Sequence, residues 1–275
     1  HRARLPASAA LNPFRQPLLQ RSAGHGLPTF SNGFLLAALR ERLAEFLLDQ
    51  CAVPGRVIVW DLETTALIDK ARVPIEEMVV SVGCANLYDV ATGSRELALT
   101  FWHEAAEWGL PLDLLPVMLT AGAPSVAYNG RGFDLLVTKR HFPSLHEYAR
   151  AGAALVDPLE AVERVTNKRY PLAELLRVNG LAPKLGDGEC APALWEAFVN
   201  GSDAAALEKL HAYCATDVDR LWQLMRLDDL KVPTSGPWLT STAGASSFSI
   251  LSSSLSSFKA RQSSCAAPLP ASSLQ

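Results

Sequence analysis

Residues 56–65, RVIVWDLETT, join a run of apolar side chains to two carboxylates. The β-branched and aromatic run at residues 56–61 predicts a central strand, buried on both faces of a sheet. Because side chains of a strand alternate between faces, Asp61 and Glu63 project to the same side, about 6 to 7 Å apart. Two carboxylates on one face repel each other. The pair therefore indicates either a solvated strand end or a site where a cation or a shared proton offsets the repulsion.

The sequence around this stretch predicts a mixed α/β domain. Residues 78–88 and 95–102, separated by a turn at 89–93, are expected to complete an antiparallel meander with the first strand. Shorter strands are expected at 125–128 and 153–156. Helices are expected at 112–120, 133–140, from 158, at 171–179 and at 202–225. An amphipathic helix capped by Ser31 precedes the first strand, with its apolar stripe formed by Leu35, Leu36, Leu39, Leu43, Phe46 and Leu47.

The two ends of the chain differ in composition from its middle. Residues 1–40 and 230–275 contain no Asp or Glu, and the C-terminal stretch is rich in serine. We expect residues 1–30 to be a disordered leader or a transit peptide for a mitochondrion or plastid, and residues 230–275 to be a disordered tail. The folded domain is then expected at 31–229. Five cysteines without a C-x-x-C pair indicate reduced thiols and an intracellular location.

Composition and charge narrow the function classes. Apolar residues make up 49% and charged residues 19% of the chain. No stretch approaches the roughly 20 uncharged apolar residues of a membrane-spanning helix, so no membrane partner is expected. Residues 41–229 hold 17 Lys and Arg against all 28 Asp and Glu, a net charge of −11. Contact with many phosphates usually requires a basic surface, so the acid excess argues against an extensive nucleic-acid interface.

Two further segments carry isolated acids next to predicted elements. Asp134 ends the stretch NGRGFD at 129–134 and lies in the first turn of a helix that follows a strand. An acid is favourable in the first turn of a helix, so Asp134 could have a structural role only. Ligand-binding and active sites of α/β domains also form there, outside the carboxyl ends of the strands. Tyr213 and Asp217 are four residues apart and share one face of the last helix. Because Asp217 interrupts an apolar stripe, we expect it to have a partner.

In this order, D-x-E at 61–63, N-x-x-x-F-D at 129–134 and Y-x-x-x-D at 213–217 resemble the three motifs of the DEDD superfamily of 3′–5′ exonucleases. Tyr213 matches the tyrosine subgroup, whereas the histidine subgroup would need histidine in place of Ala212. The resemblance covers residues 56–226 and implies a ribonuclease-H-like fold, with a five-stranded mixed sheet flanked by helices. Residues 171–217 are similar to exonuclease-like proteins related to the proofreading domain of family B DNA polymerases.

Four carboxylates without His or Cys are hard oxygen ligands, which suit Mg²⁺ or Mn²⁺. The resemblance implies two such ions. Asp61 would bridge both, Glu63 and Asp217 would hold the ion that carries the nucleophilic water, and Asp134 would help to hold the other. Tyr213 would orient that water through a hydrogen bond. Oxygens scattered in space, or a basic residue plugging the pocket, would contradict this interpretation.

The resemblance further implies removal of nucleoside 5′-monophosphates from single-stranded 3′ ends of DNA or RNA. Thr64 and Leu67 would contact the terminal nucleotide, and Asn129 and Phe133 would line the substrate groove. A turn or core packing is an alternative role for Thr64, Leu67 and Phe133. Local cations that could grip the substrate are Arg131, Lys139, Arg140, Lys168, Arg169 and Lys184.

Two alternative functions stay open. One is a noncatalytic nucleic-acid-binding module with the same fold, and the other is a nuclease that degrades short oligoribonucleotides. The second fits the acidic domain well, because a short substrate carries few phosphates. The sequence identifies no protein partner and does not distinguish DNA from RNA.

Overall fold

The computed structural model describes residues 32–67, 73–102, 110–186, 190–201, 203–227 and 230–233. The chain divides into two units at residues 41 and 42, inside helix α1 (Asn32–Ala52). The described part of the first unit is the beginning of α1, and the second unit holds every other described element. The cap expected at Ser31 lies outside the described residues.

A mixed sheet of six strands forms the centre of the second unit, in the order β4-β3-β2-β1-β5-β6. The meander is antiparallel, β5 and β6 continue parallel to β1, and β4 lies parallel to β3. The expected fifth strand is present, and β4 adds a sixth. Because β4 has two residues, one of them a proline, no alternating pattern could predict it. The strands are β1 (Arg56–Thr64), β2 (Val80–Asp89), β3 (Arg95–Trp102), β4 (Leu110–Pro111), β5 (Ser125–Val126) and β6 (Leu155–Val156).

A helix lies within each expected range, and α4 (Leu145–Ala154) is a helix that the sequence did not predict. The other helices after α1 are α2 (Leu115–Leu119), α3 (Asp134–Thr138), α5 (Pro158–Thr166), α6 (Leu172–Val178), α7 (Cys190–Gly201) and α8 (Ala204–Met225). Short 3₁₀ turns lie at Ile75–Glu77, Leu112–Leu114 and Lys139–His141. The strand expected from residue 153 begins only at Leu155, because Ala153 and Ala154 complete α4.

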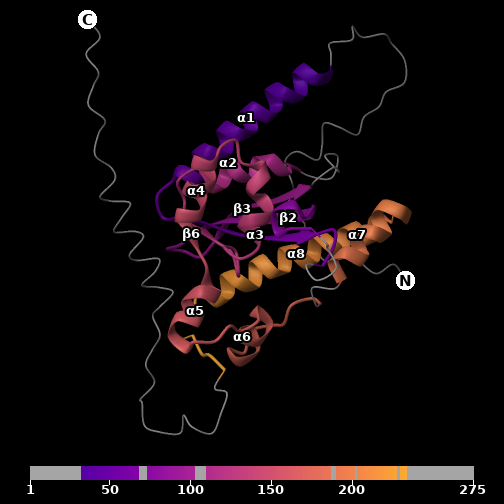
Figure 1. The fold of residues 1–275 in the computed structure, drawn as a ribbon. Helices are drawn as coiled ribbons and strands as arrows, with labels where there is room; N and C mark the ends of the chain where they lie inside the picture. Colours follow the sequence, from indigo (N-terminus) through magenta and orange to yellow (C-terminus); the bar gives the residue numbers. More distant parts are fainter. Residues whose placement is uncertain are drawn as a thin grey trace, which may run out of the picture. The chain divides into compact units, whose positions relative to one another are not determined.

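Helices cover both faces of the sheet, and the alternation along β1 decides which side chains meet which helices. Ile58, Trp60 and Leu62 are buried on the side that packs against α2, α3 and α4 (Figure 1). Val57 and Val59 are buried on the opposite side, against α5, α6 and α8. Asp61 and Glu63 continue this second series and therefore face α8.

Residues at the edges of the predicted domain refine its boundaries. Leu47 of α1 is fully buried, whereas Phe46, expected in the same apolar stripe, is 42% exposed. At the other end, Leu230 is buried, and the Tyr170 hydroxyl donates to the carbonyl of Pro233 at 2.9 Å. Residues 230–233 thus contact the folded unit. No helix among the described residues is long and apolar enough to cross a membrane.

Candidate functional site

Three carboxylates from β1 and α8 converge at the carboxyl end of β1. Asp61, Glu63 and Asp217 each offer an oxygen within 4.8 Å of the other two. Asp217 is brought there by α8, whose Val218 and Leu221 pack on the same face of the sheet. The Cys214 thiol of α8 also donates to the Asp61 carbonyl at 3.4 Å, which fixes the helix against the strand. The structure thus brings together three of the predicted acids.

Asp134 reaches the same region from the first residue of α3. Its Oδ1 accepts a hydrogen bond from the backbone N–H of Leu62 at 3.1 Å. That N–H is available because β5 pairs with β1 only at Ile58 and Val59, and the ladder has ended before Leu62. Asp134 is 2% exposed and lies outside the group of three, although its charge acts on Asp61.

Burial and mutual repulsion make these carboxyl groups reluctant to ionise. Burial, followed by the charges of Asp134, Glu63 and Asp217, raises the pKa of Asp61 well above its usual range. Burial and Asp217 raise the pKa of Glu63 to about 8. Burial raises the pKa of Asp134 to about 7, although backbone N–H groups oppose the shift. Such a cluster favours protonation or a cation.

Lys184, which the sequence analysis lists among the cations that could bind the substrate, lies beside these four acids. Its Nζ is 2.5 Å from Oδ2 of Asp217, and its charge lowers the pKa of each of the four acids. Burial raises the pKa of Asp217 despite this partner. A basic residue therefore enters the site, but it neutralises one carboxylate and leaves the group of three together.

The residues fit a divalent cation. Oδ1 of Asp217 is buried and has no hydrogen-bond partner among the described residues. A buried carboxylate oxygen without a partner is costly, and an oxygen-preferring cation would satisfy it. Because all four acids supply oxygen and none supplies nitrogen or sulfur, the donor set suits Mg²⁺ or Mn²⁺ better than zinc.

Tyr213 lies one turn before Asp217 on α8 and is 3% exposed. Burial raises the pKa of its phenol, Lys184 opposes the shift, and Glu63 and Asp217 add to it. The Lys184 ammonium lies 5.4 Å from the centre of the ring. The phenol is therefore protonated at neutral pH, and the charges of Lys184, Glu63 and Asp217 act on it.

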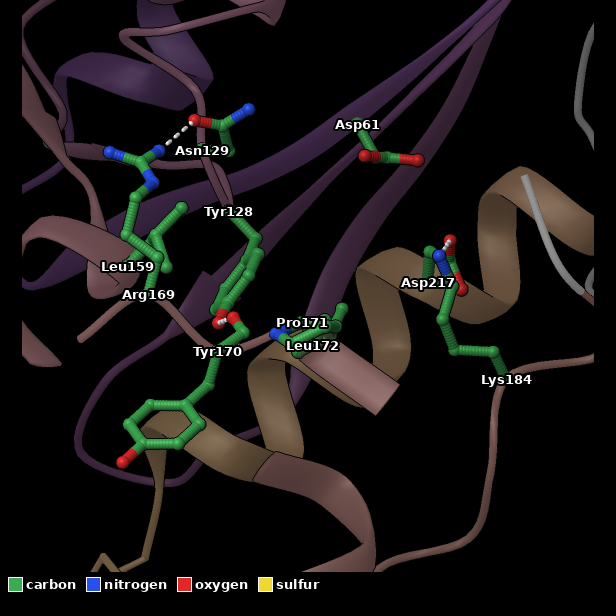
Figure 2. Close-up of a pocket in the computed structure, with 10 residues that line it drawn as sticks. All are labelled: Asp61, Tyr128, Asn129, Leu159, Arg169, Tyr170, Pro171, Leu172, Lys184 and Asp217. Atoms are coloured by element: carbon green, nitrogen blue, oxygen red, sulfur yellow. Dashed lines mark hydrogen bonds and ion pairs between the residues drawn. The ribbon is translucent and has the colours of Figure 1, made fainter. Parts of the chain in front are cut away.

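A cavity of about 410 Å³ opens beside the carboxylates (Figure 2). Of the four residues expected to bind substrate, Asn129 lines it and Thr64, Leu67 and Phe133 do not. The Thr64 hydroxyl donates to the carbonyl of Ala66, and Phe133 packs against the core under α3. The lining residues are Asp61, Tyr128, Asn129, Leu159, Arg169, Tyr170, Pro171, Leu172, Lys184 and Asp217.

Asn129 is held in place by Asp157, whose importance to the site the sequence did not reveal. The Asp157 carboxylate caps α5 through the N–H of Leu159 and also accepts from the N–H groups of Asn129 and Arg131. Asn129 has a φ of 60°, a left-handed conformation that asparagine tolerates better than most residues. The sequence signal, Asp before Pro at a helix start, predicted only the cap.

Most of the local cations expected to grip the substrate have other contacts. Arg131 donates to the carbonyls of Gly152 and Leu155, and Arg140 donates to the carbonyl of Glu77. Lys139 lies over the ring of Tyr148. Of the six expected cations, Arg169 and Lys184 line the cavity.

No curated protein sequence matches the chain. Among solved structures, a family B DNA polymerase from the hyperthermophilic archaeon Pyrobaculum calidifontis is 17% identical. The match covers 62% of this chain and 24% of that chain, with a TM-score of 0.41. E. coli exonuclease I in complex with a 5cy-dT13 oligonucleotide is 14% identical, and that match covers 57% of this chain and 43% of that one, with a TM-score of 0.32. The chain thus spans less than half the length of either structure.

A family model does match most of the folded unit. Residues 59–227, more than half of the chain, match the model described as RNase_H superfamily. This range contains most of β1, the strands β2 to β6 and the helices α2 to α8, and with them Asp61, Glu63, Asp134 and Asp217. The expected ribonuclease-H-like fold is thereby confirmed, and the chain belongs to the RNase_H superfamily.

Proposed function

We propose that the protein is a metal-dependent 3′–5′ exonuclease that removes nucleoside 5′-monophosphates from single-stranded ends. The observation that carries this proposal is the meeting of the Asp61, Glu63 and Asp217 carboxylates within 4.8 Å, with Asp134 beside them and Tyr213 on the same helix as Asp217. Four repelling acids in one partly buried place destabilise the fold, so a role that needs them together explains their arrangement.

Asp61, Glu63, Asp134 and Asp217 would hold two Mg²⁺ or Mn²⁺ ions. When bound, such a pair stabilises the negative charge on the attacking and leaving oxygens of an in-line phosphoryl displacement. The orphaned Oδ1 of Asp217 and the mutual repulsion of Asp61, Glu63 and Asp217 both favour binding of a cation.

The chain's own groups would orient the reactants. Tyr213, whose phenol is protonated at neutral pH and whose pKa burial raises further, would donate a hydrogen bond to the attacking water and would need no proton transfer of its own. The water would lose a proton as its oxygen forms a bond to phosphorus, the bond to the 3′ oxygen of the penultimate nucleotide would break, and that oxygen would gain a proton from solvent. The products are a nucleoside 5′-monophosphate and a strand shorter by one residue.

The experiment is digestion of 5′-labelled single-stranded DNA and RNA oligomers with Mg²⁺, Mn²⁺ or a chelator. We expect a ladder of labelled products that shorten one residue at a time, absent with chelator and with Asp61→Ala. The matched control is Asp203→Asn, which exchanges the exposed cap of α8 for another good cap and should retain the ladder. Absence of a ladder on both polymers with both metals would contradict the proposal and favour a noncatalytic binding module.

A further inference from the structure

The cavity beside the carboxylates has two chemically different ends. Asp61, Asp217 and Lys184 form one end, and Asn129 and Arg169 lie at the other (Figure 2). Tyr128, Pro171 and Leu172 lie between the two ends in Figure 2, and Leu159 also lines the cavity. Because the proposed reaction needs the scissile phosphate at the carboxylates, a group that binds at the far end must lie further along the substrate strand.

Arg169 is a cation held in place from two sides. Its Nη1 is 2.9 Å from Oε2 of Glu163, and its Nη2 donates to Oδ1 of Asn129 at 2.7 Å. A guanidinium has five N–H donors in a rigid fork, so these contacts leave donors for a ligand. The side chain is 53% exposed, which leaves the guanidinium accessible from the cavity.

The side chain of Asn129 is oriented by the same contact. Because Oδ1 accepts from Arg169, the amide N–H₂ is the group that remains to face a ligand. The loop is shaped for this side chain, since a Cβ added at Gly132 would lie 2.6 Å from Oδ1 of Asn129. Arg169 and Asn129 thus present N–H donors side by side.

Of the charged side chains that line the cavity, Arg169 is the one best placed to bind an anion. Two cations line this space, and the ammonium of Lys184 is taken by Asp217 at 2.5 Å. Arg169 pairs with Glu163, but that carboxylate is 39% exposed and does not line the cavity. A surface pair of this kind contributes little energy, so Glu163 leaves Arg169 able to attract a further anion. A phosphate matches the fork of a guanidinium and the neighbouring amide.

We infer that Arg169, with the amide of Asn129, binds the phosphate adjacent to the scissile one on its 5′ side. This inference rests on the proposed function and deepens it, because it assigns a minimal substrate. A dinucleoside monophosphate has a scissile phosphate alone and cannot use Arg169. A trinucleotide with two phosphodiesters can, so the site prefers substrates of three or more residues.

The test compares TpT with TpTpT, which differ by one phosphodiester, for the wild type and Arg169→Gln. Glutamine removes the charge but can still donate to Asn129. We expect Arg169→Gln to lower kcat/KM on TpTpT about tenfold, equivalent to about 1.4 kcal/mol, mainly through KM. Turnover of TpT should stay within about twofold of the wild type, since its reaction never uses this contact. Arg177→Gln, an exposed arginine on α6 outside the cavity, is the matched control and should change neither substrate.

Salt dependence supplies a readout that a merely structural role would not change. Each phosphate contact on a single strand contributes about −0.7 to the slope of log affinity against log salt, so Arg169→Gln should make the slope for 5′-labelled dT4 less steep by about 0.7. Arg169→Lys should keep the slope and lose part of the affinity, because it retains the charge without the fork. This second variant keeps the test informative if the glutamine variant does not fold.

The outcomes separate the inference from the proposed function. Equal losses on TpT and TpTpT, or no loss on either with an unchanged salt slope, overturn the role of Arg169. If the wild type hydrolyses neither TpT nor TpTpT, the ladder on the longer DNA and RNA oligomers decides on the proposed exonuclease, and the dT4 binding series alone decides whether Arg169 contacts a phosphate.

Discussion

At the scale of single residues, the surroundings of Asp61 strongly disfavour its ionised form. Burial and three neighbouring acids raise its pKa, so the ionised side chain destabilises the metal-free protein. We predict that Asp61→Asn raises the free energy of unfolding of the metal-free protein, because it removes a charge that burial and the neighbouring acids disfavour, while it abolishes activity. Urea denaturation in chelator measures the change. Asp203→Asn should leave stability within about 0.5 kcal/mol, and destabilisation by Asp61→Asn would contradict the repulsion argued here.

The same residues predict how stability depends on pH. Glu63 titrates near 4.5 in the unfolded chain and at about 8 in the fold, and Asp134 near 3.8 and at about 7. Between these values the folded state binds more protons than the unfolded state, so stability falls as pH rises. We expect Tm of the metal-free protein to decrease from pH 5 to about pH 8, and the decrease to be smaller with saturating Mn²⁺. A Tm that rises over this range would contradict the direction of both shifts.

At the scale of elements, the start of α5 connects helix capping to the cavity beside the carboxylates. Asp157 is 6% exposed, and its carboxylate accepts hydrogen bonds from the backbone N–H groups of Asn129, Arg131 and Leu159. Removing its carboxylate leaves the cap and two loop donors unsatisfied. We predict that Asp157→Ala lowers the free energy of unfolding by about 2 to 3 kcal/mol, against about 1 kcal/mol for Asp203→Ala at the exposed cap of α8. Equal effects in urea denaturation would show that Asp157 acts as a cap only.

Strands and helices whose apolar residues recur at a regular spacing could be predicted from the sequence, and elements without such a spacing could not. The buried run before Asp61 and the stripe on α8 gave the central strand and the last helix, and strand alternation placed Asp61 and Glu63 on one face. The two residues of β4 are too few to show an alternation of apolar and polar side chains. The small residues at the end of α4 give no signal for the position at which the helix ends. The position of Lys184 on Asp217 depends on a loop between α6 and α7, which no local pattern fixes.

At the scale of the whole molecule, the acid excess limits affinity for nucleic acid. Residues 41–229 carry a net charge of −11, and of the six cations expected to grip substrate only two line the cavity. We therefore predict weak binding of single strands, with Kd of about 1 μM or weaker at physiological salt, and steep salt sensitivity. Digestion with a trap of unlabelled strand should stop after very few residues. Nanomolar affinity for long duplex DNA at the same salt would contradict this prediction.

The central claim is that Asp61, Glu63, Asp134 and Asp217 form a site for divalent cations, and calorimetric titration with Mn²⁺ tests it most directly. We predict saturable binding by the wild type and by Asp203→Asn, and strongly weakened binding by Asp61→Asn. Absence of Mn²⁺ binding, or equal binding by the wild type and Asp61→Asn, would contradict the claim.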